Sequence, residues 1–160
     1  IGAPTICKWL KDQAIAAGVE AGRDMSNYKV MVAAPAYMGD KKNSIEKVKW
    51  FPAMVGNHVA DIVERYGENT DEVPESLTSY IKNRKGYDYS KHGQSDNPYL
   101  DFITEDVVDE FCVLGEADEH VQKLNKLKEA GMTQFNIYLD SGDEEKIIAD
   151  YGEKIIPEFS

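Results

Sequence analysis

The chain has few of the residues that define several classes of protein. It holds two cysteines, Cys7 and Cys112, which are too few and too far apart in sequence for a disulfide framework. We therefore expect two buried thiols and a cytoplasmic protein. Its 18 basic residues are outnumbered by 29 acidic residues, which gives a net charge of −11. Because this charge repels phosphate backbones and no segment concentrates Lys and Arg, nucleic-acid binding is not expected.

Long apolar runs and several well-known catalytic loops are also missing. No run approaches the roughly 20 apolar residues that span a bilayer, so we expect no membrane segment. The three histidines, at positions 58, 92 and 120, lack the spacing of metal ligands, and no metal site is predicted. The sequence contains no Gly-x-Gly-x-x-Gly loop, Walker loop or serine elbow, which removes support for a hydrolase or kinase.

What the chain does contain is an ordinary globular composition arranged in helices and strands. Apolar residues make up 42% of the chain and charged residues 29%. Strands are predicted at 28–34, ended by Pro35, and at 134–140. The apolar spacing predicts helices at 4–21, from Asn43 to Tyr66 with a kink or two abutting helices near Pro52 and Gly56, at 74–83, after Thr104, from Gly115 to Gly131 and after 141–143.

Two strands are too few for the helices that surround them. The order helix, strand, helices, strand, helix is typical of the α/β class, yet two strands do not make a self-sufficient sheet. The first residue is Ile rather than Met. We therefore expect the chain to be a truncated part of a larger α/β domain.

Five segments, in order along nearly the whole chain, carry a resemblance to a known family. They are Ala21-Gly22-Arg23-Asp24, the segment from Trp50 to Asp61, Tyr87-Asp88-Tyr89-Ser90-Lys91-His92-Gly93, the segment from Val108 to Gly115, and the segment from Tyr151 to Pro157. Together they resemble a methylenetetrahydromethanopterin reductase-like branch of the luciferase-like monooxygenase family. The resemblance implies the C-terminal portion of a TIM (β/α)8 barrel spanning 1–160. In that portion 29–37 and 134–140 would be the seventh and eighth strands, and 74–115 an excursion at the barrel mouth.

The resemblance also implies a cofactor and a class of reaction. Members of the family use FMN or the deazaflavin coenzyme, factor 420, for hydride transfer or monooxygenation of a small organic substrate. The early strands that carry much of the flavin pocket have no counterpart here, so this fragment alone is not expected to bind cofactor tightly. A homodimer is left open. Two alternatives also stay open: a TIM-barrel enzyme of another reaction class, and a non-catalytic acidic interaction domain.

The pocket candidates follow from the place of TIM-barrel sites, which is the carboxyl ends of the strands. No catalytic residue is assigned. A structural loop pinned by its aromatic side chains is the alternative interpretation of the stretch 85–101. The candidates are Pro35, Ala36 and Tyr37 after one strand, Asp140 after the other, and Tyr89 and His92 in the irregular stretch 85–101.

Three further polar positions are interpreted structurally. Ser141, Gly142 and Asp143 begin a helix whose free N–H groups could meet an anion, but ordinary helix capping is the favoured interpretation. His58 is expected in the core or at a helix interface. His120 is expected to be solvated on an amphipathic turn.

Overall fold

The computed structural model describes residues 1–66 and 103–160, with the side chains of 59, 60 and 62–66 excepted. The predicted helix at 74–83 lies outside these ranges. The described elements are α1 (Pro4–Glu20), β1 (Met31–Met38), α2 (Lys41–Val48), α3 (Trp50–Tyr66), α5 (Glu105–Phe111), β2 (Val113–Gly115), α6 (Ala117–Glu129), β3 (Gln134–Tyr138) and α7 (Glu144–Asp150), followed by a π-turn (Tyr151–Ile155) and a 3-10 turn (Ile156–Phe159).

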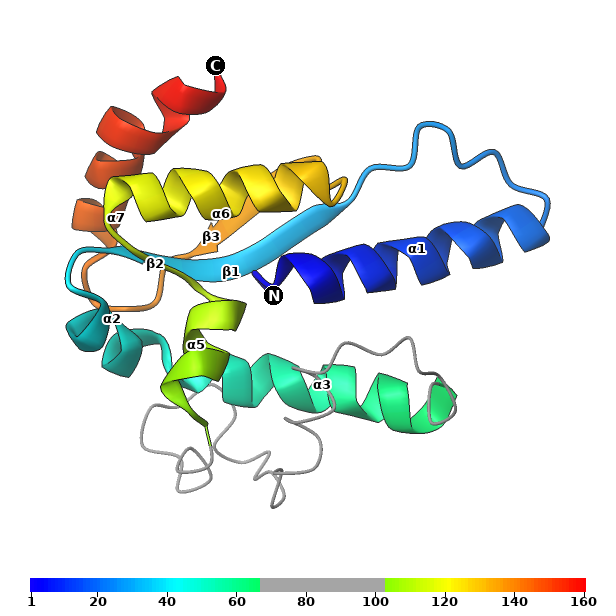
Figure 1. Cartoon of the computed structure of the whole chain (residues 1–160), viewed down its shortest axis with the longest axis horizontal. Coiled ribbons are helices and arrows are strands. Elements are labelled where there is room, and N and C mark those ends of the chain that lie inside the picture. Colours follow the sequence, from blue (N-terminus) through cyan, green and yellow to red (C-terminus); the bar gives the residue numbers. More distant parts are fainter. Residues whose placement is uncertain (67–102) are drawn as a thin grey trace.

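The centre of the fold is a parallel sheet with the strand order β2-β1-β3 (Figure 1). The start of β1 pairs with β3, in the register Met31↔Gln134, and its end pairs with β2, in the register Ala36↔Val113. The two predicted strands are therefore confirmed and lie side by side. The prediction of only two strands is wrong, because β2 adds a third.

The prediction that Pro35 ends the first strand is wrong. Pro35 lies inside β1, in the last pair with β3 and directly before the first pair with β2. Proline lacks an N–H, so a strand tolerates it where a ladder of hydrogen bonds ends. The change of partner strand at Pro35 gives it such a position.

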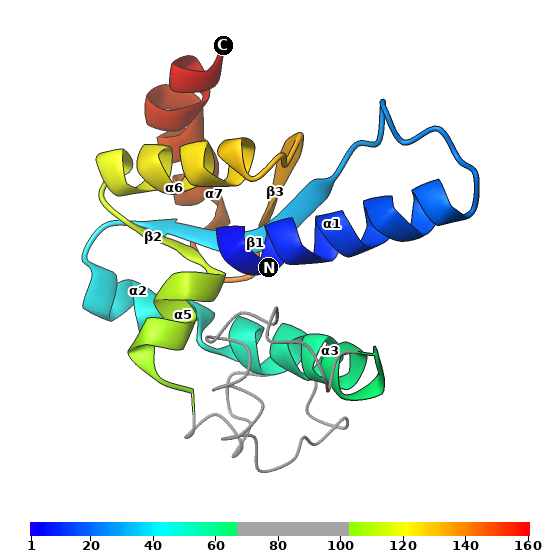
Figure 2. The same ribbon diagram turned by 45° about the vertical axis from the view of Figure 1, so that its right-hand side comes forward.

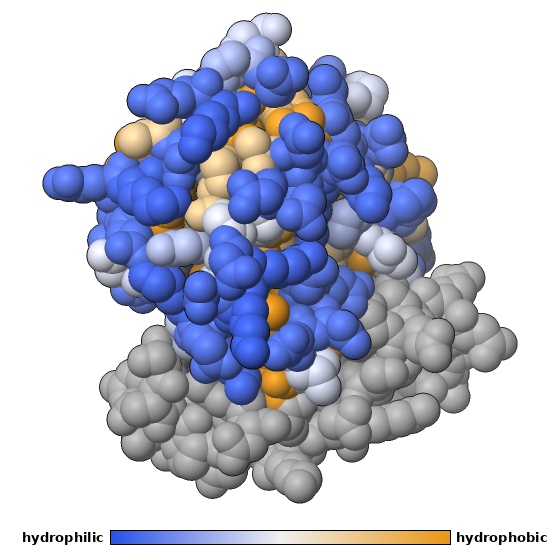
Figure 3. Space-filling model, turned by 60° about the vertical axis from the view of Figure 1, so that its left-hand side comes forward, coloured by the Kyte–Doolittle hydropathy of each residue, from blue (hydrophilic) through white to orange (hydrophobic). Residues whose placement is uncertain are grey.

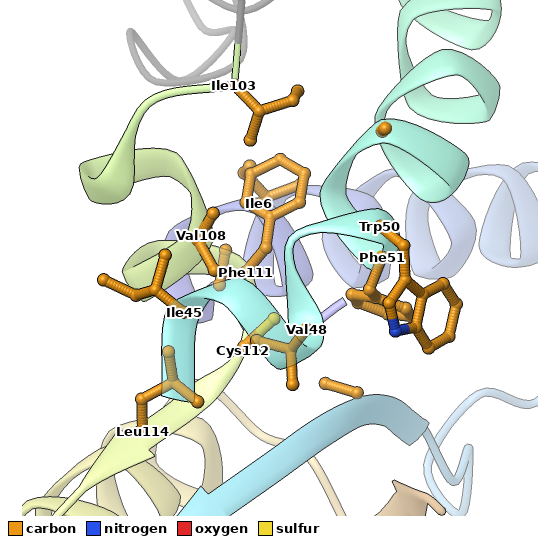
Figure 4. Packing of buried hydrophobic residues seen from close by; sticks show 13 residues of the cluster. Ile6, Ile45, Val48, Trp50, Phe51, Ile103, Val108, Phe111, Cys112 and Leu114 are labelled. Carbon is orange, nitrogen blue, oxygen red and sulfur yellow. The ribbon is translucent and has the colours of Figure 1, made fainter. Parts of the chain in front are cut away.

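Helices cover the sheet from both sides, as a parallel sheet requires. Helices α6 and α7 lie on one side, and α2, α3 and α5 lie on the other (Figures 1 and 2). Two apolar clusters result. The first joins α1, α2, α3 and α5 to the sheet through Ile6, Ala34, Ile45, Val48, Phe51, Val108, Phe111 and Leu114 (Figure 4). The second joins α6, α7 and the π-turn to the sheet through Val32, Ala36, Met38, Val113, Leu124, Leu127, Ile147, Tyr151 and Ile155.

The helix that was predicted from Asn43 to Tyr66 is two abutting helices. It begins earlier than expected, because Asp40 is the N-cap and accepts a hydrogen bond from the Asn43 backbone N–H at 3.0 Å. The break falls at Lys49, between α2 and α3, and not at Pro52. Pro52 lies in the first turn of α3, where its missing N–H would have no partner within the helix anyway.

Both cysteines are buried free thiols, as predicted. Burial raises the pKa of the Cys112 thiol to about 12, so it stays protonated near neutral pH. Within 1–66 and 103–160, no helix is both long and apolar enough to cross a membrane.

Lys123 of α6 caps the carboxyl end of α5. Its ammonium donates hydrogen bonds to the backbone carbonyls of Asp109, Glu110 and Cys112, the second at 2.9 Å. These carbonyls belong to the last turn of α5 and the residue after it, where helix carbonyls lack intrahelical partners. Burial lowers the pKa of Lys123 to about 8, which still leaves the ammonium form dominant at neutral pH.

Replacing Lys123 with methionine is expected to lower the free energy of unfolding by about 2 kcal/mol, because three carbonyls lose their donor while the apolar stem remains. Denaturant unfolding measures the change. Lys126→Met on the exposed side of the same helix is the matched control and should change stability by less than about 0.5 kcal/mol. Equal losses in the two variants would contradict the role given to Lys123.

Candidate functional site

The carboxyl ends of β1 and β3 come together at one edge of the sheet. At this edge Pro35 and Ala36 are buried, and Ala36 is 1% exposed. Tyr37 is half-buried. Asp140 is exposed in the loop after β3, and its carboxylate makes no hydrogen bond or ion pair to any described residue. Of the four predicted strand-end residues, Tyr37 alone presents a polar side-chain atom that binds another part of the fold.

The other two candidates, Tyr89 and His92, fall outside the described residues, so their pocket role stays a prediction. The same holds for residues 74–102 of the predicted excursion. The described remainder of that segment contains α5 and β2. Thr104 caps α5 as predicted, since its side chain accepts a hydrogen bond from the Val107 N–H.

A cluster of four polar side chains surrounds the end of β1. We call it the Tyr37 cluster; it comprises Tyr37, Lys47, Asp143 and Lys146. The Tyr37 hydroxyl donates to Asp143 Oδ2 at 2.7 Å, and the Lys47 ammonium donates to the same oxygen. The Lys47 and Lys146 ammonium groups lie 4.9 Å and 5.3 Å from the centre of the Tyr37 ring. The cluster joins β1, α2 and the start of α7 at the strand ends.

The hydrogen bonds within the cluster keep Asp143 and Lys47 charged. The hydrogen bond from Lys47, followed by that from Tyr37, lowers the pKa of the Asp143 carboxyl. The same bond to Asp143 raises the pKa of Lys47. Asp143 is therefore an anion and Lys47 a cation across the neutral range. The side of the molecule on which α2 and α7 lie has a largely hydrophilic surface (Figure 3).

The favoured interpretation of 141–143, ordinary helix capping, is only half right. Asp143 is the N-cap residue of α7, but its side chain makes no capping hydrogen bond. The carboxylate binds Tyr37 and Lys47 instead. Asp143, three residues after the predicted Asp140, is thus the acidic residue that reaches the strand ends. Sequence spacing gives no means of choosing between the two carboxylates.

Two further features lie where β3 ends. Tyr138, the last residue of β3, packs against Phe51 and Trp50 of α3, with ring centres 5.4 Å and 6.4 Å apart. The Ser141 hydroxyl is buried and has no hydrogen-bond partner among the described residues. A buried polar atom of this kind normally has a partner, so Ser141 is an exception among the described residues.

His120 is buried, which contradicts the expectation of a solvated side chain. It is 0% exposed, with Nδ1 at 2.9 Å from the Tyr151 hydroxyl and Nε2 at 3.3 Å from the Tyr37 carbonyl oxygen. Burial lowers its pKa to about 4, so the imidazole is neutral at neutral pH. A signal was present in the sequence: Leu124 and Leu127 follow at helical spacing and place His120 on the buried face of α6.

The prediction that His58 lies in the core is wrong, because this side chain of α3 is exposed. Its alternative, a position at a helix interface, stays a prediction. The neighbouring Asn57 is the buried polar residue of this turn, at 2% exposed, and its amide donates to the Ala53 carbonyl at 2.5 Å.

A cavity of about 690 Å³ lies between α6, β3 and the last turns of the chain. Leu127, Phe135 and Ile155 are among its mostly apolar lining residues. Thr133 and Gln134, at the start of β3, also line it, so it extends toward the amino ends of the strands. Because the polar groups gather at the opposite ends, the Tyr37 cluster is the better candidate for a functional site.

Comparisons with known proteins agree on one family. The sequence model of the luciferase-like monooxygenase family matches residues 4–134. The 5,10-methylenetetrahydromethanopterin reductase of Methanopyrus kandleri is 28% identical over 145 residues, which cover 88% of this chain and 38% of that protein. In fold, the chain is similar to the structure of the coenzyme F420-dependent tetrahydromethanopterin reductase from the same organism, with a TM-score of 0.62 and 23% identity. That match covers 99% of this chain and 44% of the other. The chain thus spans less than half the length of either relative, and it belongs to the luciferase-like monooxygenase family.

Proposed function

We propose that the chain forms the C-terminal part of a TIM (β/α)8-barrel oxidoreductase that transfers hydride with the deazaflavin coenzyme F420. Membership of the luciferase-like family supports the oxidoreductase class. The two relatives are named as reductases, one of them as F420-dependent, which favours the deazaflavin over FMN and hydride transfer over monooxygenation. Methylenetetrahydromethanopterin, named for the relative, is the first substrate to test.

The observation that carries this proposal is the place of the Tyr37 cluster. TIM-barrel enzymes build their sites at the carboxyl ends of the strands, and the cluster surrounds the end of β1. It combines a phenol, a carboxylate and two ammonium groups in a half-exposed setting. In the described residues β3 pairs on one side only, which is compatible with a sheet that continues into further barrel strands.

The polar groups at the strand ends fit the hydrogen-bonding groups of a cofactor or substrate. At the end of β1, Lys47 and Lys146 keep partly exposed ammonium groups while they pair with Asp143 and Asp150. These lysines would meet carbonyl or acidic groups of a bound coenzyme. The coenzyme, when bound, supplies the hydride chemistry.

In that chemistry, the residues of this chain bind and orient the reactants, and one of them holds a proton. Tyr37 carries its proton on the hydroxyl that donates to Asp143. Asp143 fixes the direction of that hydroxyl, and Lys47 balances the carboxylate charge. We propose that the Tyr37 phenol thereby orients a polar atom of the substrate or coenzyme.

The Tyr37→Phe variant tests this function in the enzyme that carries the chain. We expect kcat/KM for methylenetetrahydromethanopterin with reduced coenzyme F420 to fall about tenfold, since the phenol loses its hydrogen bond to the substrate or coenzyme, worth about 1.5 kcal/mol. The rate is followed by the visible absorption of the oxidised coenzyme. Reduced FMN in place of the deazaflavin should support no turnover.

Tyr28→Phe is the matched control for this test. Tyr28 is 44% exposed, lies before β1, and its hydroxyl makes no hydrogen bond to a described residue. We expect the control to keep wild-type kcat/KM. An unchanged rate in Tyr37→Phe, or an equal loss in both variants, would overturn the proposed site.

A further inference from the structure

A single imidazole connects three elements behind the Tyr37 cluster. His120 comes from α6, its Nε2 atom lies 3.3 Å from the backbone carbonyl of Tyr37 in β1, and its Nδ1 atom lies 2.9 Å from the Tyr151 hydroxyl. A carbonyl oxygen only accepts hydrogen bonds, so Nε2 carries the hydrogen. Nδ1 of the neutral ring is then the acceptor, and the Tyr151 hydroxyl donates to it. The contacts therefore define one tautomer of His120.

The second partner lies at an irregular point of the last helix. Regular α-helix ends at Asp150, and the next turn, Tyr151–Ile155, is a π-turn. Such wide turns are rare and often occur at functional sites. Tyr151 is its first residue, is 6% exposed and meets the His120 ring edge to face, with centres 5.6 Å apart. The π-turn thus occurs where the chain places a hydroxyl against His120.

The first partner belongs to the residue that carries the candidate site. The Tyr37 carbonyl is held by His120, while the Tyr37 hydroxyl binds Asp143 at 2.7 Å. The next carbonyl, of Met38, accepts a hydrogen bond from Lys146 at 3.0 Å. The last two carbonyls of β1 are thus both held by side chains of helices outside the sheet. This arrangement fixes the backbone from which the Tyr37 side chain projects.

We propose that His120 is a positioning residue for Tyr37, and that Tyr151 orients His120 through the Nδ1 hydrogen bond. This inference rests on the proposed function of the Tyr37 cluster. His120 acts through the backbone of Tyr37 and makes no hydrogen bond to the Tyr37 phenol. Its neutral Nε2–H holds the carboxyl end of β1, and the phenol keeps its hydrogen bond to Asp143.

The experiment combines kinetics with a direct probe of Tyr37 in the enzyme that carries the chain. His120→Leu should lower kcat/KM by about as much as Tyr37→Phe, roughly tenfold, because it removes one polar anchor. His120→Gln keeps a donor and an acceptor and should restore most of the rate. In the double variant, Tyr37→Phe with His120→Leu, the loss should not exceed that of Tyr37→Phe alone, since both changes act on one phenol. A purely structural role would give additive losses.

The NMR signal of Tyr37, labelled at the carbon that bears the hydroxyl, separates this inference from the proposed function. We expect His120→Leu to move it toward the position of an exposed tyrosine, and His120→Gln to leave it in place. If His120→Leu does not fold, Tyr151→Phe removes one hydroxyl and should move the signal in the same direction. An unmoved signal in a folded variant, or additive kinetic losses, overturns the inference. If Tyr37→Phe leaves the rate unchanged, the proposed site fails, and the signal still decides the role of His120.

Discussion

Truncation of Phe111 to alanine is expected to lower the free energy of unfolding by about 3–5 kcal/mol, the range for a large aromatic side chain removed from a packed core. Phe111 is 0% exposed and belongs to the cluster that joins α1, α2, α3 and α5. Side chains of these four helices surround it (Figure 4). The Phe111 carbonyl also accepts a hydrogen bond from the Gly2 N–H at 2.7 Å. Because this bond holds the backbone in place, the surrounding residues cannot easily move in to fill the cavity that the substitution leaves.

Denaturant unfolding of the protein gives the measurement, from the transition midpoint and slope. Phe159→Ala is the control, because Phe159 is 38% exposed in the last turn. It should change the free energy of unfolding by less than about 1 kcal/mol. A loss below about 1 kcal/mol in Phe111→Ala would show that this cluster is not a packed core.

Acid should destabilise the protein between about pH 6.5 and pH 4 through His120. Its pKa is about 4 in the folded protein and 6.5 for an exposed imidazole. As the pH falls through 6.5 the unfolded chain binds a proton, while the folded protein binds it only near pH 4. The unfolded state therefore binds more protons in this window, and stability falls with falling pH, by up to about 3 kcal/mol.

The measurement is the free energy of unfolding at a series of pH values. In His120→Gln, which cannot titrate, the slope between pH 6.5 and pH 4 should become shallower than in the wild type. Gln122→Ala on the exposed side of α6 is the control, because it removes no titratable group and should leave the slope unchanged. The two variants are compared by slope, because His120→Gln also changes stability by a constant amount. Equal slopes in wild type and His120→Gln would contradict the prediction.

Periodicity and capping predicted the described helices to within a few residues. α1 and α6 follow from their apolar spacing and glycine stops, and α5 from Thr104. β2 was missed because three residues, 113–115, are too short to show a period. The predicted strand ended too early, at Pro35. Whether a strand accepts a proline depends on its partner strands, which lie far away in the sequence. The family resemblance, with a strand at 29–37, came closer to the observed Met31–Met38.

The sequence placed Tyr37 at a strand end, the general place of barrel sites, but it did not show which side chains bind Tyr37. The role of Tyr37 in a pocket stays a prediction. Asp143 and Lys47 bind Tyr37 from α7 and α2, and nothing local in the sequence selects them over Asp140 or other lysines. His120 was assigned to solvent although its spacing to Leu124 and Leu127 indicates burial. Its partner Tyr151 lies 31 residues further along the chain, beyond the reach of any local pattern.

The strand order has a consequence for how the chain folds. No two of the described strands are joined by a hairpin. The hydrogen bond just before the β1–β3 pairing, between Val30 and Thr133, joins residues that are 103 apart in the sequence. The entropy of closing so long a loop is lost before any strand pairing compensates for it. Helices form from local contacts on a much faster timescale. Folding should therefore proceed from preformed helices to a late sheet, and the site at the end of β1 is assembled last.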